Sequence, residues 1–257
     1  MPNLFALHER EILVFALLTI RMMAFIFSSA IFGQNNVNMQ MKVLFSLSLS
    51  FVFFPFAQKY ALAYQEDVLV LHVVREVAVG LVLGFATKIF FLTVSMVGEL
   101  LSSQVGLSSS QLLNPALGSH STSMEQFYVL IASILFLYLN GHHVFIIGIN
   151  ESVKVIPIGG LTFKTGSLAE IAMLGSKLLE MAVRFCAPVL VTTLIANISM
   201  AIVSRAVPQI NVLVTSMPVT IMLGLGVMII TMPLIIQAMG QLMDFSQIQL
   251  FKLIRGL

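Results

Sequence analysis

The sequence predicts an all-α integral membrane protein, and three observations lead to this fold class. Of the 257 residues, 58% are hydrophobic and 9% are charged, whereas a soluble domain carries roughly 25% charged residues. Mean hydropathy is +1.01, so a soluble fold would have to expose large apolar areas to water. Long apolar stretches recur along the chain. In lipid they have to be helical, because an open strand edge leaves backbone groups without partners.

A single membrane-embedded domain is therefore expected over residues 1–257. A helix needs about 20 apolar residues to span a bilayer. The third and fifth stretches exceed about 30 residues, so they have to tilt, bend or extend beyond the bilayer. The six stretches cover, approximately, Ile12–Phe32, Val43–Ala57, Val68–Gly98, Phe127–Ile149, Ile171–Val203 and Val212–Ile236.

Two local patterns complicate this assignment. In the second stretch, serines at 46, 48 and 50 alternate with apolar residues, which is a strand pattern, but helix is still expected because the segment lies in lipid. Pro188 in the fifth stretch, and Pro218 and Pro233 in the sixth, are expected to break their helices.

Loop charges predict the orientation of the six spans. The side that holds both termini carries more Lys and Arg, which places the termini in the cytoplasm. Those residues are Arg10, Lys59, Lys154, Lys164, Lys252 and Arg255, against Lys42 and Arg205 on the opposite side.

Several charges lie inside or at the end of apolar stretches, where each costs about 3 kcal/mol at a helix centre. They are expected to face protein or water, as buried charges or subunit contacts. Arg21 in particular is expected to have a buried structural partner. The set comprises Arg21, Arg75, Glu76, Lys88, Glu99, Lys177, Glu180 and Arg184.

Two of these groups have helical spacing. Lys177, Glu180 and Arg184 form one stripe whose members can pair. The stripe is typical of a partner contact or a water-filled path, although snorkelling near a helix end would give the same pattern. Gly80 and Gly84 form a GxxxG motif, which lets another helix backbone approach closely.

Two connecting segments stand out. Residues 102–125 are rich in Ser and Thr and contain no Lys or Arg, which for so long a connection indicates function or disorder. Arg205 precedes Pro208, Gln209 and Asn211. The proline ends a helix, and the two amides can then satisfy freed backbone groups or reach a partner, although a simple turn has the same pattern.

Signals of catalysis and of ligand binding are weak. His142 and His143 are adjacent, so on a helix they point about 100° apart and rarely share a metal. A polar cap at a helix break beside Asn140 and Gly141 is the alternative reading. We expect no catalytic residue, no metal and no cofactor, and a net charge of +2 does not favour nucleic acid.

Short motifs in order along the chain resemble the FliR family of flagellar export-gate proteins, called SctT in virulence secretion systems. The resemblance covers nearly the whole length. Its motifs are Arg21, Gly98-Glu99, Gln104 to Ser108, Asn114-Pro115, Asn140-Gly141-His142, Pro157-Ile158-Gly159, Ala187-Pro188 and Arg205 to Asn211.

The resemblance implies a non-enzymatic core subunit of a type III secretion export gate in the flagellar basal body. Such a subunit forms, with FliP-like and FliQ-like proteins, a channel for unfolded flagellar proteins, next to FlhB-like and FlhA-like components. Its helices would be long, kinked hairpins packed into a hetero-oligomeric helical assembly. The assembly would lie in the bacterial inner membrane and be partly raised toward the periplasm.

The resemblance also implies that the 102–125 segment plugs the closed pore, with leucines that exclude water. The residues in question are Gly106, Leu107, Ser108, Ser109, Leu112, Leu113, Asn114 and Pro115. From the residues alone, a secondary transporter of a small solute and an intramembrane enzyme remain alternatives. The first would show paired halves with discontinuous helices, and the second a reactive pair at helical spacing.

Overall fold

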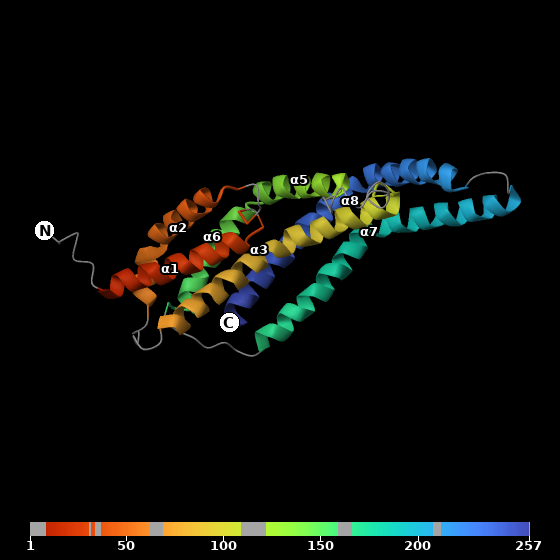
Figure 1. The fold of residues 1–257 in the computed structure, drawn as a ribbon. Coiled ribbons are helices and arrows are strands. Elements are labelled where there is room, and N and C mark those ends of the chain that lie inside the picture. The colour runs from red at the N-terminus through yellow and green to blue at the C-terminus, as the bar shows by residue number, and fades with distance from the viewer. Residues whose placement is uncertain are drawn as a thin grey trace. The chain divides into compact units, whose positions relative to one another are not determined.

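The structure is a computed structural model that describes residues 9–30, 32–33, 37–61, 69–108, 122–158, 166–207 and 212–256. Every regular element in this part of the chain is a helix, as Figure 1 shows, so the all-α class is confirmed. The helices are α1 (Glu9–Ser28), α2 (Met39–Tyr60), α3 (Leu69–Val105), α5 (Ser123–Tyr138), α6 (Gly141–Val155), α7 (Gly166–Ala206) and α8 (Val212–Gly256).

Five of the described helices are long and apolar enough to cross a membrane. Within the described residues, α1, α2, α3, α7 and α8 each contain a candidate span, and α5 with α6 would supply a sixth if the pair crosses as one broken span. The membrane class predicted from hydropathy therefore holds. The expected stretch from Phe127 to Ile149 is two helices rather than one.

The expected helix breaks at the three prolines are wrong. Helix α7 runs through Pro188, and α8 runs through Pro218 and Pro233. A proline removes one backbone donor and costs about 3 kcal/mol in a helix interior. In an apolar environment, however, interrupting the helix would leave several more backbone groups unpaired, so continuation with a local adjustment costs less.

The chain instead breaks at Asn140. This residue has a φ of 56° in the left-handed region, which asparagine adopts more readily than most residues. Helix α5 ends with the Leu139 amide donating to the Leu135 carbonyl at 2.8 Å, and α6 starts with the His143 amide donating to the Asn140 carbonyl at 2.9 Å. The helix break beside Asn140 and Gly141, which was the alternative reading for the adjacent histidines, is confirmed.

The alternating serines lie in a helix, as expected. Ser46 and Ser50 are buried in α2, and each hydroxyl donates to the carbonyl four residues earlier at 2.7 Å. These bonds satisfy the hydroxyls within the helix, so the two buried serines need no partner outside α2.

The structure divides into two compact units. The first comprises Met1–Ile89, Asn140–Ala172 and Asp244–Leu257. In it α1 packs against α2, and α2 packs against α6. Its core is a set of apolar side chains at helical spacing that are nearly inaccessible, among them Leu18, Met22, Ile26, Val79, Leu83, Ile149, Val153 and Leu253.

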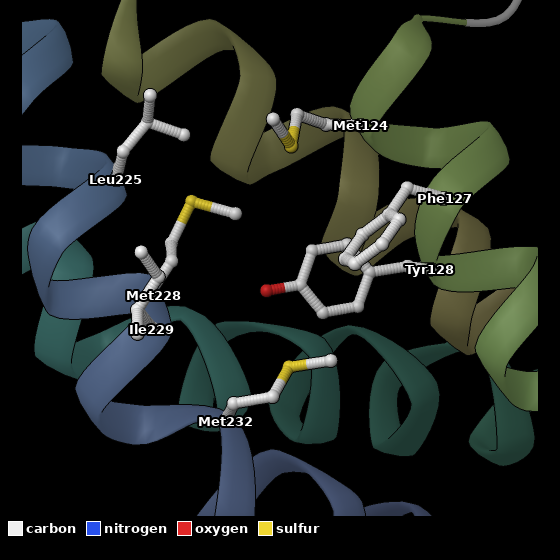
Figure 2. A pocket seen from close by; sticks show the side chains of 7 residues that line it. All are labelled: Met124, Phe127, Tyr128, Leu225, Met228, Ile229 and Met232. Carbon is white, nitrogen blue, oxygen red and sulfur yellow. The ribbon is translucent and has the colours of Figure 1, made fainter.

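The second unit comprises Phe90–Leu139 and Met173–Met243. Its buried residues recur every three or four positions along each helix, which places them on one face. The core includes Phe90, Val94, Val97, Leu101, Ala132, Phe136, Ala182, Cys186, Val189, Met239 and Leu242. Beside this core, α5 and α8 line an apolar pocket that is rich in methionine (Figure 2).

Both units leave many large apolar side chains uncovered. Phe51 on α2 is 76% exposed, and Ile230 on α8 is 77% exposed. Water would make such a surface unfavourable, so lipid or protein has to cover it.

Candidate functional site

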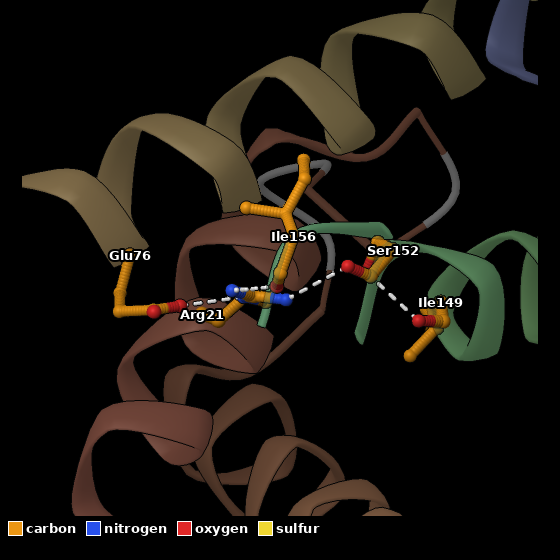
Figure 3. A network of polar contacts seen from close by, with 5 residues as sticks. All are labelled: Arg21, Glu76, Ile149, Ser152 and Ile156. Carbon is orange, nitrogen blue, oxygen red and sulfur yellow. Dashed lines mark hydrogen bonds and ion pairs between the residues drawn. The ribbon is translucent and has the colours of Figure 1, made fainter. Parts of the chain in front are cut away.

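A buried ion pair joins α1 to α3 in the first unit. Arg21 is completely inaccessible and Glu76 is 3% exposed. The Arg21 Nε lies 2.5 Å from Glu76 Oε2, and Figure 3 shows the two side chains pointing toward each other. A charge-assisted hydrogen bond of this kind is roughly twice as strong as a neutral one.

The other guanidinium nitrogens cap the end of α6. Arg21 Nη1 donates to the Ser152 carbonyl at 3.3 Å, and Nη2 donates to the Ile156 carbonyl at 3.0 Å. The last carbonyls of a helix have no partner in the helix itself and carry partial negative charge. The Ser152 carbonyl also accepts from the Ile156 amide at 2.9 Å. Arg21 adds a charged donor to this carbonyl and to that of Ile156, so a single side chain ties together α1, α3 and α6.

The contacts of this centre tie helices together. Arg21 directs its donors to Glu76 and to two backbone carbonyls, which leaves the pair well satisfied. A buried ion pair with these additional hydrogen bonds offsets much of its desolvation penalty, whereas loss of one partner costs about 3–5 kcal/mol. The arrangement fixes the packing of three helices.

The two glycines of the GxxxG motif lie beside this ion pair. A Cβ added at Gly80 would collide with the Arg21 carbonyl and the Ala24 side chain, and one added at Gly84 would collide with Ser28. Helix α1 therefore lies directly on the glycine face of α3. The close approach lets the Ser28 hydroxyl lie within 3.3 Å of the Leu81 carbonyl, and it brings Arg21 within reach of Glu76.

The charged stripe on α7 lies at the surface of the second unit. Glu180 pairs with Lys177 at 2.9 Å and with Arg184 at 2.6 Å. The Lys177, Glu180 and Arg184 side chains are 45%, 41% and 73% exposed. The ion pairs are thus internal to one helix, and the described residues leave the stripe uncovered on its outer face.

The remaining charges of the set occupy varied positions. Arg75 and Lys88 are half-buried on α3, and neither forms an ion pair with another described residue. Glu99 is exposed at the surface of α3, so the structure does not place it in a buried contact.

The first residues of the expected plug directly follow α3 and close its last turn. Gly106 has a φ of 88°, its amide donates to the Ser103 carbonyl, and the Leu107 amide donates to the Ser102 carbonyl at 3.0 Å. This is the Schellman pattern, in which a left-handed glycine ends a helix. Helix also occupies residues 102–105 and 123–125, so the connection is shorter than 102–125.

The rest of the plug and most of the turn motif lie outside the described residues. Leu107 and Ser108 follow α3, and Arg205 is exposed in the last turn of α7. The positions that the structure does not describe are Ser109, Leu112, Leu113, Asn114, Pro115, Pro208, Gln209 and Asn211.

Sequence reasoning missed the contact that holds the start of α5 on α3. The Glu125 amide donates to the Thr122 hydroxyl at 3.2 Å, and the Ser95 hydroxyl donates to the Glu125 carboxylate. A Cβ at Gly98 would lie 2.5 Å from the Glu125 Cα. The T-x-x-E spacing of Thr122 and Glu125 is typical of a helix start, so it could have indicated where α5 begins, but not the contact with Ser95.

The adjacent histidines lie side by side at the start of α6. Their rings lie with centroids 4.2 Å apart at the start of α6. Among the residues that the structure describes, His, Cys, Asp and Glu side chains form no group of three or more that could hold a metal ion.

The long apolar helices and the buried arginine, which contacts a carboxylate and two backbone carbonyls, define an all-α membrane protein with an ion pair in its interior. The chain belongs to the bacterial export proteins, family 1, whose family model matches residues 12–246. It is similar to flagellar biosynthetic protein FliR of Bacillus subtilis strain 168, at 28% identity over 224 residues that cover 86% of each chain.

Two further relatives match over a similar share of the chain. FliR of Aquifex aeolicus strain VF5 is 25% identical over 243 residues, which cover 93% of this chain and 94% of that protein. FliR of Escherichia coli strain K12 is 24% identical over 216 residues, which cover 84% and 83% of the two chains. The match therefore extends through nearly all of the helices described above.

Proposed function

We propose that this chain is a non-enzymatic core subunit of a flagellar protein-export gate, which forms with FliP-like and FliQ-like subunits a channel for unfolded flagellar proteins. The observation that carries the proposal is the match to export proteins along residues 12–246. The relatives that match over most of their length are flagellar biosynthetic proteins.

The surface of the chain supports an assembled role. Helices α7 and α8 bury only 22% of the residues in their most apolar windows, and the charged stripe of Lys177, Glu180 and Arg184 shares α7 with these apolar residues. Ionised side chains are costly in contact with hydrocarbon. Neighbouring subunits that cover both the apolar side chains and the charges would remove this cost.

The proposed location follows from the same reasoning. The gate would lie in the bacterial inner membrane within the flagellar basal body, partly raised toward the periplasm, next to FlhB-like and FlhA-like components. Both termini would be cytoplasmic if the loop charges govern insertion. The energy for export would come from elsewhere in the apparatus.

Co-purification in gentle detergent tests the proposal. The tagged chain, expressed from its own chromosome, is expected to bring down FliP-like and FliQ-like proteins at fixed ratios by mass spectrometry. Isolation as a lone monomer, with or without solute transport after reconstitution, would overturn it.

A further inference from the structure

Helix α3 carries a second face in the first unit, separate from the glycine face that packs on α1. Six residues on this face recur at alternating intervals of three and four, which is the a/d spacing of a coiled-coil seam. They are Leu71, Val74, Ala78, Leu81, Phe85 and Lys88, and together they are called the α3 seam. At about 100° per residue, the α3 seam is centred about 110° around the helix from Gly80 and Gly84, so it points away from α1.

The described residues leave much of the α3 seam uncovered. Leu71 is 42% exposed, Val74 is 58% exposed and Leu81 is 47% exposed, and the other three members are half-buried. With a rise of 1.5 Å per residue, the seam is about 25 Å long. This length matches a contact with one partner helix over nearly five turns.

Lys88 places a positive charge in this seam. Its ammonium group forms no hydrogen bond or ion pair with another residue in the described part of the chain. A membrane span of about 20 residues, placed anywhere within Leu69–Val105, contains Lys88. An ammonium group within a span is costly unless a counter-charge lies beside it, so the group that covers the seam has to supply an anion.

Arg75 adds a second cation at the edge of the seam. It follows Val74 and occupies the e position, which in coiled coils pairs with charges of the partner helix. Its side chain is half-buried and forms no ion pair with another described residue. Glu76 is adjacent in sequence but lies on the opposite side of α3, where it pairs with Arg21. The open side of α3 in the first unit therefore carries two cations without a counter-charge of its own.

We propose that the α3 seam is the contact surface for one helix of a neighbouring subunit, which has an apolar heptad stripe and an Asp or Glu opposite Lys88. The inference rests on the proposed function, because it requires that the chain has neighbours in an assembly. Charge complementarity selects this occupant. A lipid acyl chain would leave both cations without a counter-charge, and a second copy of the same seam would place like charges together.

Charge substitution at Lys88 tests the pairing. Lys88→Glu should lower the ratio of partner to chain after co-purification by about tenfold or more, because two carboxylates would oppose each other, whereas Lys88→Arg should retain the partner. Lys88→Met should also lower this ratio, yet leave the thermal midpoint of the isolated chain unchanged or raise it. Lys154→Met is the matched control, because Lys154 forms an exposed pair with Glu151 in the same unit, and it should change neither readout.

Photo-crosslinking identifies the helix that covers the seam. A benzophenone amino acid at Val74 and, in a second variant, at Leu81 should capture positions about seven residues apart on one partner helix, because the two sites are one heptad apart on α3. Changing the acidic residue of the captured helix to Lys should restore partner retention to the Lys88→Glu variant.

Three results would overturn this inference while leaving the proposed function intact. They are crosslinks to lipid alone, crosslinks to a second copy of this chain, and equal partner retention by wild type and Lys88→Glu. Failure of the wild-type chain to capture any partner would overturn the proposed function and this inference together.

Discussion

The guanidinium of Arg21 and the carboxylate of Glu76 lie 55 residues apart in the chain and meet at 2.5 Å in the interior of the first unit. The same guanidinium caps the last turn of α6 through the Ser152 and Ile156 carbonyls. Three helices therefore depend on one side chain, and the consequences can be measured.

Replacing Glu76 with leucine should destabilise the folded chain by about 3–5 kcal/mol, because Arg21 would remain buried without its counter-charge. Equilibrium unfolding in mixed detergent micelles would measure the loss. Glu151→Leu is the control, since Glu151 forms an exposed pair with Lys154 at 3.0 Å, and it should cost less than about 1 kcal/mol.

The double variant Arg21→Met with Glu76→Leu distinguishes the interaction between the two charges from the effect of each charge alone. Both charges leave together, so the double variant should recover a large share of the stability that the single Glu76 variant loses. A loss of stability in the double variant that equals the sum of the losses in the two single variants would contradict the pairing.

Gly80→Ala should destabilise the chain by about 1–3 kcal/mol, because the added methyl would collide with the Arg21 backbone and Ala24. Gly226→Ala is a matched control in α8, where an added Cβ meets nothing within 4 Å. That control should be neutral or stabilising by about 0.5–1 kcal/mol, because alanine favours helix. Thermal unfolding compares the two, and equal effects would mean that α1 does not lie against Gly80.

Glu180→Leu should weaken co-purification of partner subunits while leaving the stability of the isolated chain within about 1 kcal/mol of wild type. The change leaves Lys177 and Arg184 without the carboxylate that both contact, on a surface that partners are proposed to cover. Quantitative mass spectrometry of the purified complex would measure the effect. Unchanged assembly would place the stripe at a lipid interface.

Deletion of residues 107–113 should increase ion leakage in cells that carry the complete gate, because the proposed plug would lose Leu107, Leu112 and Leu113. Leakage is measured as a growth defect of the cells or as release of a small dye from them. A control deletion of equal length in the 159–165 segment should not leak. Unaltered leakage with the 107–113 deletion, at normal assembly, would count against the plug.

The sequence by itself determined the membrane class and the helical secondary structure. Hydropathy decides where a segment is stable, and the lack of water in lipid requires each segment to satisfy its own backbone groups. These are properties of local stretches, which explains why the alternating serines of α2 could be assigned to a helix and why the break beside Asn140 could be anticipated.

Only the tertiary structure decided which charged groups are buried. Arg21 is paired because Gly80 and Gly84 allow α1 to approach α3 closely, and because the end of α6 supplies two carbonyls at the same point. Glu125 of α5 contacts Ser95 of α3 because the first turn of α5 lies against Gly98, whereas Glu99 on α3 is exposed. Such pairings depend on side chains that are distant in sequence and meet only when the helices pack, so no pattern within a single helix contains them.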